Sequence, residues 1–313
     1  MEDKVNEPVC RTSIGGQAII EGVMMRGPLV SAMSTRMPDG TIDTETWENK
    51  KTQAWYKKTP FIRGIFNLID SLSMGYKCLM KSAEKSGMDL DEEPTKFEKW
   101  LVEKFGNGMM KVISAFALVA GALLAMLLFM IIPTYAVKFL DMLVPLGGFK
   151  TVLEGIIKII VFVGYLALVA KMPEIHRVFE YHGAEHKTIA CYEGGEELTP
   201  ENVRKYRRFH PRCGTSFILI VLVISIIVFS FVPWASGVLR IIIKFLLLPV
   251  VVGIAYEIIK FAGRHDNFFT KIISAPGLWL QRLTTAEPDD SQIETAIASM
   301  LPVIPAEKGI DKW

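Results

Sequence analysis

Long apolar stretches constrain the fold of this chain more than any other feature of its sequence. Residues 112–132 carry no charged side chain, and about 20 residues suffice for a helix to cross a hydrocarbon core of about 30 Å. Residues 216–235 are likewise uncharged, residues 152–171 and 238–259 are apolar apart from a few charged side chains, and half of all residues are hydrophobic. The sequence therefore predicts a mainly α, polytopic helical membrane protein with about four transmembrane helices, the first extending over residues 112–140.

The positions of lysine and arginine predict the orientation of these helices. The loop between the second and third stretches (residues 173–215, with Lys171 just before it) is strongly basic, whereas the loops on the other side offer little beyond Lys138 and Lys150. Loops rich in Lys and Arg stay in the cytoplasm. We therefore expect this loop, the N-terminus and the C-terminus to be cytoplasmic, in a multi-pass protein of the cell membrane.

Part of that loop forms a basic cluster, made of Arg204, Lys205, Arg207 and Arg208. Beside a bilayer, such residues contact anionic lipid headgroups, with roughly 1 kcal/mol for each charge near the surface. Nucleic acid is not an expected partner, because no aromatic platform accompanies the cluster. The expected partner is the lipid bilayer.

The remaining segments lack spanning character. Residues 1–55 contain short apolar runs interrupted by glycines and a Pro38-Asp39-Gly40 turn, which predicts a small cytoplasmic β-rich part with a hairpin. Residues 60–86 have helical periodicity with interspersed charges, which fits an interfacial helix or, alternatively, ordinary core packing. In the cytoplasmic C-terminal part, residues 260–313, we expect a break at Pro276-Gly277 and a short amphipathic helix near residues 291–301.

One helix carries the pattern His-x-x-Glu-His. Pro173 is a favourable first helical residue and Gly194-Gly195 a favourable stop, so residues 174–193 are predicted to be helical. His182 and His186 then lie one turn apart on the same face, with Glu185 beside them. This spacing directs two imidazoles toward one ion and places a carboxylate where it can act as a base. The alternative is a pair of histidines with structural hydrogen bonds.

A catalytic zinc ion typically takes three protein ligands and leaves a position for water. We expect Glu257 to be the third ligand, because an ionisable residue near the end of a spanning helix is costly unless it is paired or functional. Simple pairing with Lys260 or Arg264 is the alternative. Lesser candidates are His210 and Cys213, in a loop before the third stretch, and Glu21. The alternative for Glu21 is that it is a carboxylate in the protein core whose hydrogen bonds are satisfied.

Cysteine spacing gives no disulfide framework. The cysteines are widely scattered and include no Cys-x-x-Cys pair: they are Cys10, Cys78, Cys191 and Cys213. In the expected topology Cys191 and Cys213 are cytoplasmic, where thiols stay reduced.

Four motifs resemble the bacterial YqhQ-like family. They are Gly-Gly-Gln-Ala-Ile-Ile-Glu-Gly-Val-Met-Met-Arg-Gly, Tyr-His-Gly-Ala-Glu-His-Lys-Thr, His-Pro-Arg-Cys-Gly-Thr-Ser and Pro-Gly-Leu-Trp-Leu-Gln-Arg-Leu-Thr-Thr, and the similarity covers about residues 15–300. The resemblance implies an inner-membrane protein of undefined function, described as a predicted metal-dependent enzyme. It gives roles to His182, Glu185 and His186 but none to Glu257 or Cys213.

Two functions follow as expectations. The first is a zinc-dependent hydrolase, peptidase-like in its His-x-x-Glu-His order, in which His182 and His186 hold the ion and Glu185 activates water. The inverted zinc peptidases have the same order, but this chain shares neither their length nor their fold, so the analogy is local. The second is a non-enzymatic membrane assembly, translocation or transport factor with a structural histidine cluster and a membrane-protein partner.

Overall fold

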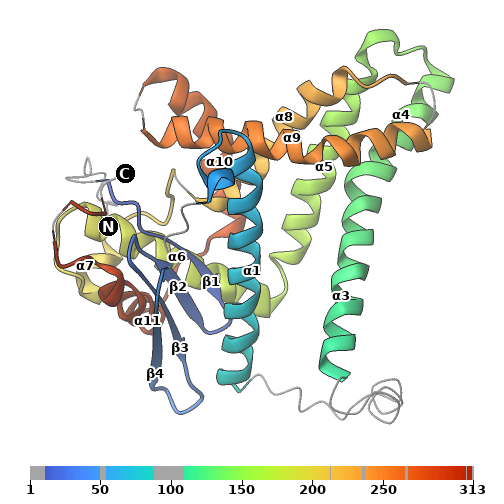
Figure 1. The fold of residues 1–313 in the computed structure, drawn as a ribbon. Helices are drawn as coiled ribbons and strands as arrows, with labels where there is room; N and C mark the ends of the chain where they lie inside the picture. The colour runs from blue at the N-terminus through green and yellow to red at the C-terminus, as the bar shows by residue number, and fades with distance from the viewer. Residues whose placement is uncertain are drawn as a thin grey trace. The chain divides into compact units, whose positions relative to one another are not determined.

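The computed structural model describes residues 11–49, 54–87, 109–211, 213–234, 237–264, 267–307 and 309–311. The chain divides into two compact units. Unit 1 comprises Met1–Gly87, Tyr165–Val221 and Pro249–Trp313, and unit 2 comprises Met88–Gly164 and Leu222–Leu248. Figure 1 labels the helices and strands of both units.

Unit 1 contains a four-stranded antiparallel sheet in the order β1-β2-β3-β4. The strands are β1 (Gly15–Ile19), β2 (Gly22–Arg26), β3 (Val30–Arg36) and β4 (Ile42–Glu48). The predicted turn at Pro38-Asp39-Gly40 joins β3 to β4, where Gly40 has φ of 84° and the Asp39 side chain accepts a hydrogen bond from the Thr41 amide at 2.9 Å. The expected β-rich N-terminal part is confirmed.

Helices cover both faces of the sheet. Because side chains alternate along a strand, Val23 and Met25 of β2 enter a core with residues of α6 (Pro173–Glu193) and α11 (Asp290–Met300). Met24, on the opposite face, packs in a smaller cluster with Cys78 of α1 (Ile62–Lys85). The predicted helices at residues 60–86, 174–193 and 291–301 are thus confirmed as helices.

Helix α10 (Phe268–Thr284) corrects one expectation. It runs through Pro276-Gly277 without a break, although a proline inside a helix removes one backbone hydrogen bond. Packing against α8 (Gly214–Ser230) accounts for the glycine, because a Cβ atom at Gly277 would lie 2.5 Å from Cβ of Ser216. The predicted turn residues serve as a close-packing site. Short elements complete unit 1: η1 (Trp55–Lys57), α7 (Pro200–Arg204) and η5 (Leu301–Val303).

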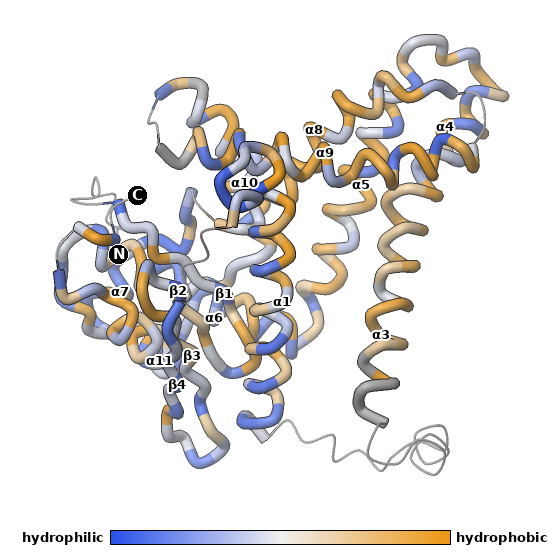
Figure 2. Tube along the Cα trace, in the orientation of Figure 1, coloured by the Kyte–Doolittle hydropathy of each residue, from blue (hydrophilic) through white to orange (hydrophobic). Residues whose placement is uncertain are grey.

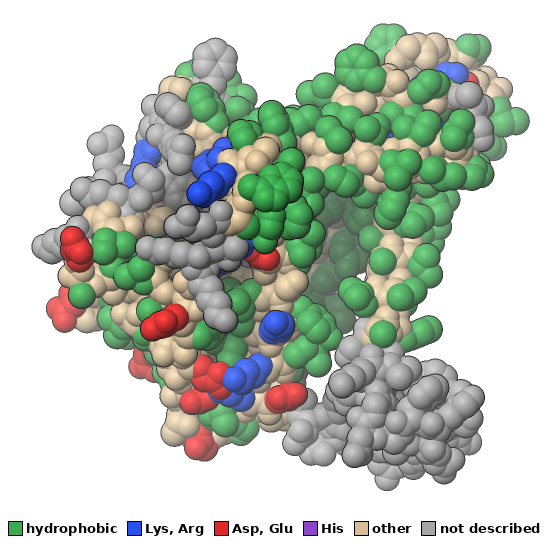
Figure 3. Space-filling model, viewed as in Figure 1, with side chains coloured by type: hydrophobic (Ala, Val, Ile, Leu, Met, Phe, Trp, Pro, Cys, Tyr) green, Lys and Arg blue, Asp and Glu red, His purple; other side chains and the backbone are tan. Residues whose placement is uncertain are grey.

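The apolar stretches form long helices. The long helices are α3 (Met109–Met126), α5 (Lys150–Val169), α8 and α9 (Gly237–Arg264). Shorter elements lie between α3 and α5: η3 (Leu127–Ile131, a π-helical turn), α4 (Ile132–Leu143) and η4 (Gly147–Phe149). Figure 2 shows the apolar colouring along α3, α5, α8 and α9. In Figure 3 hydrophobic side chains cover the outer surface of α3 and the neighbouring apolar helices, whereas basic (Lys or Arg) and acidic side chains gather near the strands and α1.

Within the described residues, three helices are long and apolar enough to cross a membrane: Ala115–Leu143, Gly147–Val169 and Gly237–Ala262. Helix α8 is equally apolar but only 17 residues long. The chain is therefore mainly helical, with a small N-terminal antiparallel sheet and three helices of membrane-spanning length.

Candidate metal centre

Helix α6 carries both motif histidines and begins and ends where the sequence predicts. Pro173 is its first residue, and Gly195, with φ of 72°, follows its end. Close packing surrounds the motif: a Cβ atom at Gly183 would lie 2.1 Å from the carbonyl oxygen of Ala286. The small residues of the motif therefore admit the segment between α10 and α11 to the surface of α6.

The two histidines are held by backbone carbonyls through the same ring nitrogen. Nδ1 of His182 lies 2.7 Å from the carbonyl oxygen of Thr284, and Nδ1 of His186 lies 2.6 Å from that of Arg208. A carbonyl oxygen only accepts, so each Nδ1 carries the proton and donates. In metal sites this arrangement fixes the ring and leaves Nε2 for the ion.

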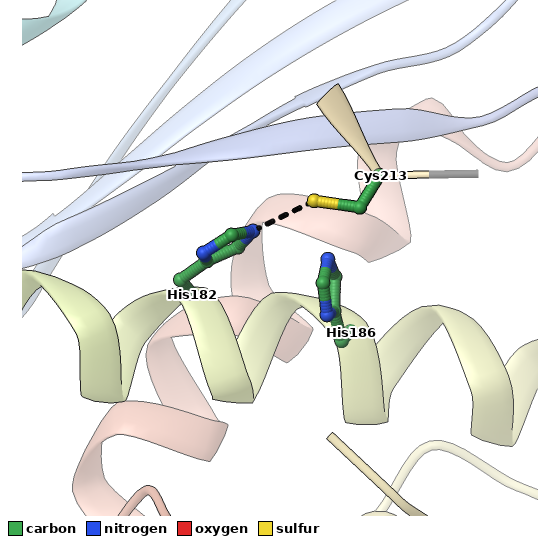
Figure 4. Close-up of side chains that lie close together, drawn as sticks. All are labelled: His182, His186 and Cys213. Atoms are coloured by element: carbon green, nitrogen blue, oxygen red, sulfur yellow. Dashed lines mark hydrogen bonds between the residues drawn. The ribbon is translucent and has the colours of Figure 1, made fainter. Parts of the chain in front are cut away.

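Cys213 completes a group of three potential ligands. Its Sγ lies 3.2 Å from Nε2 of His182, and the ligand atoms of His182, His186 and Cys213 all lie within 4.8 Å of one another. Figure 4 shows the sulfur facing both rings. Zinc bonds of about 2.0–2.3 Å require ligand atoms roughly 3.3–3.6 Å apart, so a small inward movement would bring this group to tetrahedral spacing.

Charges at this group favour a thiolate. Burial opposes ionisation of Cys213, but the two imidazoles hold its pKa well below the usual range of a thiol. Burial alone would lower the pKa of His182, yet the charge and hydrogen bond of Cys213 raise it to about 9. The charges of this arrangement therefore favour an imidazolium–thiolate pair of His182 and Cys213 over the two neutral groups.

Glu185 lies beside this group with unused hydrogen-bonding capacity. The residue is 4% exposed, and burial raises the pKa of its carboxyl group. Among the described residues its Oε2 has no hydrogen-bond partner. Buried carboxylate oxygens are normally paired, so an orphan oxygen beside two histidines and a thiolate is the kind of group that contacts a bound water or substrate.

Glu257, the expected third ligand, has a different partner. Arg63 of α1 donates two hydrogen bonds to its carboxylate: Nε to Oε1 at 2.7 Å, and a second, shorter bond from Nη2 to Oε2. The amide of Phe61 donates to the same Oε1 at 3.1 Å. The ligand group contains Cys213 in the place that Glu257 was expected to fill. The sequence predicts Lys260 or Arg264 as the alternative partners of Glu257 and not Arg63, because a partner almost 200 positions away leaves no local pattern.

Of the lesser candidates, His210 borders the ligand group, whereas Glu21 pairs with an arginine. The ring of His210 lies 5.7 Å from that of His186, and its Nε2 lies 3.5 Å from Oε2 of Glu193, so it borders the group. Glu21 sits in the turn between β1 and β2 and binds Arg177 of α6 through both oxygens. Glu21 is therefore a satisfied carboxylate that attaches the hairpin to α6.

The basic cluster is partly engaged within the protein. Arg204 pairs with Asp290, and Arg208 contacts Glu287 at 3.4 Å. Lys205 donates to the side chain of Asn202 at 2.9 Å. The contacts of Arg204 and Arg208 attach the loop to the first residue of α11 and to the segment before it, whereas the contact of Lys205 is local.

Fold and site together define a class of protein: a chain with helices of membrane-spanning length and a sheet-containing unit that holds a buried His-Cys group. The chain belongs to the family described as "Protein of unknown function (DUF1385)", whose model matches residues 59–306. A relative with 37% identity over 289 residues, covering 91% of this chain and 90% of its own length, is the "Uncharacterized protein YqhQ" of Bacillus subtilis (strain 168). No solved structure matches the chain. The family resemblance is thus confirmed, whereas its description as a metal-dependent enzyme stays a prediction.

Proposed function

We propose that this protein is a multi-pass membrane protein with a zinc-dependent hydrolase site at its cytoplasmic face. The observation that carries the proposal is the common orientation of His182 and His186, whose Nδ1 atoms are both bound to carbonyls while Nε2 of His182 contacts Cys213 Sγ. Two imidazoles and a thiolate are ligands suited to zinc, and three of them leave a fourth position for water.

The proposed roles follow from the geometry. His182, His186 and Cys213 would hold the ion, which when bound would act as a Lewis acid and lower the pKa of water. Glu185, with an oxygen that has no partner among the described residues, takes the proton of the attacking water and returns it to the leaving group. The backbone carbonyls of Thr284 and Arg208 keep both rings in place. A hydrolysable bond near the membrane surface, such as a peptide bond, is the proposed substrate class.

The proposed topology has four spans, with α8 as the third. Helix α8 is short at 17 residues, but it is uncharged and follows the basic loop directly, so a slightly thinner bilayer or an extension at one end accommodates it. The site then lies on the cytoplasmic side, because the positive charge of residues 173–215 keeps that loop inside.

Burial favours a second candidate, a structural zinc site in a non-enzymatic assembly, translocation or transport factor. His186 is 2% and Cys213 8% exposed, and His210 lies close enough to His186 to serve as a fourth ligand after a side-chain rotation. A structural zinc site is closed, with four protein ligands. His210 therefore separates the candidates: the enzyme does not need it as a ligand, whereas the structural site does.

The test compares Glu185→Gln with His210→Ala in cells that lack the chromosomal gene. For the enzyme, Glu185→Gln retains the metal but fails to complement, because loss of a general base costs about 10²–10⁴-fold in rate, and His210→Ala retains the metal. Full complementation by Glu185→Gln, together with loss of metal from His210→Ala, would establish the structural site in its place.

A further inference from the structure

Lys158 of α5 is buried inside unit 2, although a lysine in an apolar helix is expected to extend its ammonium group to the membrane surface. The residue is 5% exposed. Glu154 lies one turn before it on α5, and α9 carries Arg240 and Lys244, also one turn apart and both almost fully buried. Two facing helices thus contribute charged residues at i, i+4 spacing to the interior of the unit.

Both carboxylate oxygens of Glu154 accept hydrogen bonds from the two cations of α9. Arg240 donates through Nη2 to Oε2 at 3.0 Å, and Lys244 donates to Oε1. Thr134 of α4 donates to the same Oε1 at 2.9 Å and accepts from Lys244 at 3.0 Å. One carboxylate therefore neutralises one of two adjacent cations, and no further acidic residue appears among the contacts of this group in the described part of the chain.

Lys158 adds a third cation to this group but brings no carboxylate with it. Its Nζ lies 3.5 Å from Oγ of Ser225, the limit of a hydrogen bond, and 4.9 Å from the centre of the Phe229 ring. Lys244 lies 5.7 Å from the centre of the same ring, so Phe229 connects the two ammonium groups. Nε of Arg240 also has no partner among the described residues. The interior of unit 2 consequently carries an excess of positive charge and unused N–H donors.

Such an excess requires compensation, because an uncompensated buried charge is strongly destabilising. We propose that unit 2 binds a small monovalent inorganic anion of the chloride class, held by Lys158 together with Lys244 and Arg240. The low exposure of all four charged residues favours a small anion with one charge, since the cost of removing water rises with the charge of the ion. This proposal is independent of the metal centre, whose residues all belong to unit 1.

The experiment uses the full-length protein in nanodiscs of zwitterionic lipid and measures equilibrium binding of radiolabelled chloride. The wild type is expected to bind about one chloride per chain, displaced by unlabelled bromide. Lys158→Met keeps the length of the side chain and removes the charge, so affinity should fall about tenfold or more, as for the loss of a charge-assisted hydrogen bond. Lys158→Arg should retain binding.

The matched control is Lys138→Met, which removes one cation from α4 of the same unit, where Lys138 lies over the ring of Tyr135; it should leave chloride affinity unchanged. The wild-type measurement is decisive even if a variant fails to fold. No binding above protein-free nanodiscs, or equal affinity in the wild type and a folded Lys158→Met variant, would overturn the proposal.

Discussion

The backbone of Gly16 lies against the carboxyl group of Glu185: a Cβ atom at residue 16 would come within 3.1 Å of Cδ of Glu185. The same atom would lie 2.6 Å from the carbonyl oxygen of Met24. Only glycine leaves room at this point for strand β1, strand β2 and the motif carboxylate. The N-terminal sheet is thereby part of the wall of the candidate site and belongs to the same compact unit as His182, His186 and Cys213.

Gly16→Ala should lower the apparent Tm and disturb Glu185. Overpacking of a closely packed interior typically costs about 1–3 kcal/mol, and here the obstacle includes a backbone carbonyl that has little freedom to move. Thermal unfolding in detergent measures the effect. Gly15→Ala is the matched control, because a Cβ atom there meets nothing within 4 Å. Equal Tm values for the two variants would contradict the described packing.

The pair between Arg63 and Glu257 should contribute to stability and not to metal binding. Both side chains are about one-fifth exposed, so we expect a coupling of ~1 kcal/mol between them. A double-mutant cycle with Arg63→Met and Glu257→Gln, read by unfolding, measures this coupling. Zinc content should stay at the wild-type level in both variants. A loss of zinc from Glu257→Gln would restore the carboxylate as a ligand.

Zinc binding to the metal-free protein at pH 7 should release about one proton per ion. The two imidazoles favour a Cys213 thiolate, because they hold its pKa well below the usual range, whereas His182, with a pKa of about 9, carries a proton on Nε2 that zinc must displace. Since zinc and this proton compete, affinity should rise with pH and level off above about pH 9.

Calorimetry in buffers with different ionisation enthalpies gives the number of protons released. Cys213→Ser is the control, because without the thiolate His182 loses the partner that raises its pKa. Release of two protons by the wild type would mean that the Cys213 thiol is protonated, and release of none would mean that His182 is neutral; either result would contradict the ion pair.

The proposed topology predicts the side on which each loop lies. Reporter fusions after residues 145 and 235 should report the outer side of the membrane, and a fusion after residue 195 the cytoplasm, because the basic loop remains inside. A fusion after residue 195 that reports the outer side would move the site to the other face and remove the basis for a cytoplasmic hydrolase.

Local patterns in the sequence were sufficient for the elements near the site. Pro173 and Gly194-Gly195 delimit α6, and Pro38-Asp39-Gly40 marks the hairpin, since helix ends and tight turns depend on a few neighbouring residues. The prediction of a break at Pro276-Gly277 is wrong because it also rests on a local pattern. Packing of Gly277 against Ser216 overrides that pattern.

Contacts between distant segments were less predictable. Helical spacing predicts that His182 and His186 lie together, whereas Cys213 is only a weak candidate, because its position depends on how the loop before α8 folds over α6. No sequence pattern predicts that the carbonyls of Thr284 and Arg208 bind the two histidine rings, because every residue has a backbone carbonyl. A charged residue in an apolar helix predicts a functional role for Glu257, but its partner Arg63 lies too far away in sequence for a local pattern to indicate the pair.

The most direct test of the proposed metal centre is the zinc content of the purified protein, measured by mass spectrometry for the wild type and for His182→Ala, His186→Ala, Cys213→Ala and Glu185→Gln. The wild type and Glu185→Gln should each contain about one zinc per chain, because a general base is not a ligand. Each of the other three variants should lose most of its zinc, since two remaining ligands bind it poorly. Stoichiometric zinc in all three ligand variants, or none in the wild type, would contradict the assignment of His182, His186 and Cys213 as a metal centre.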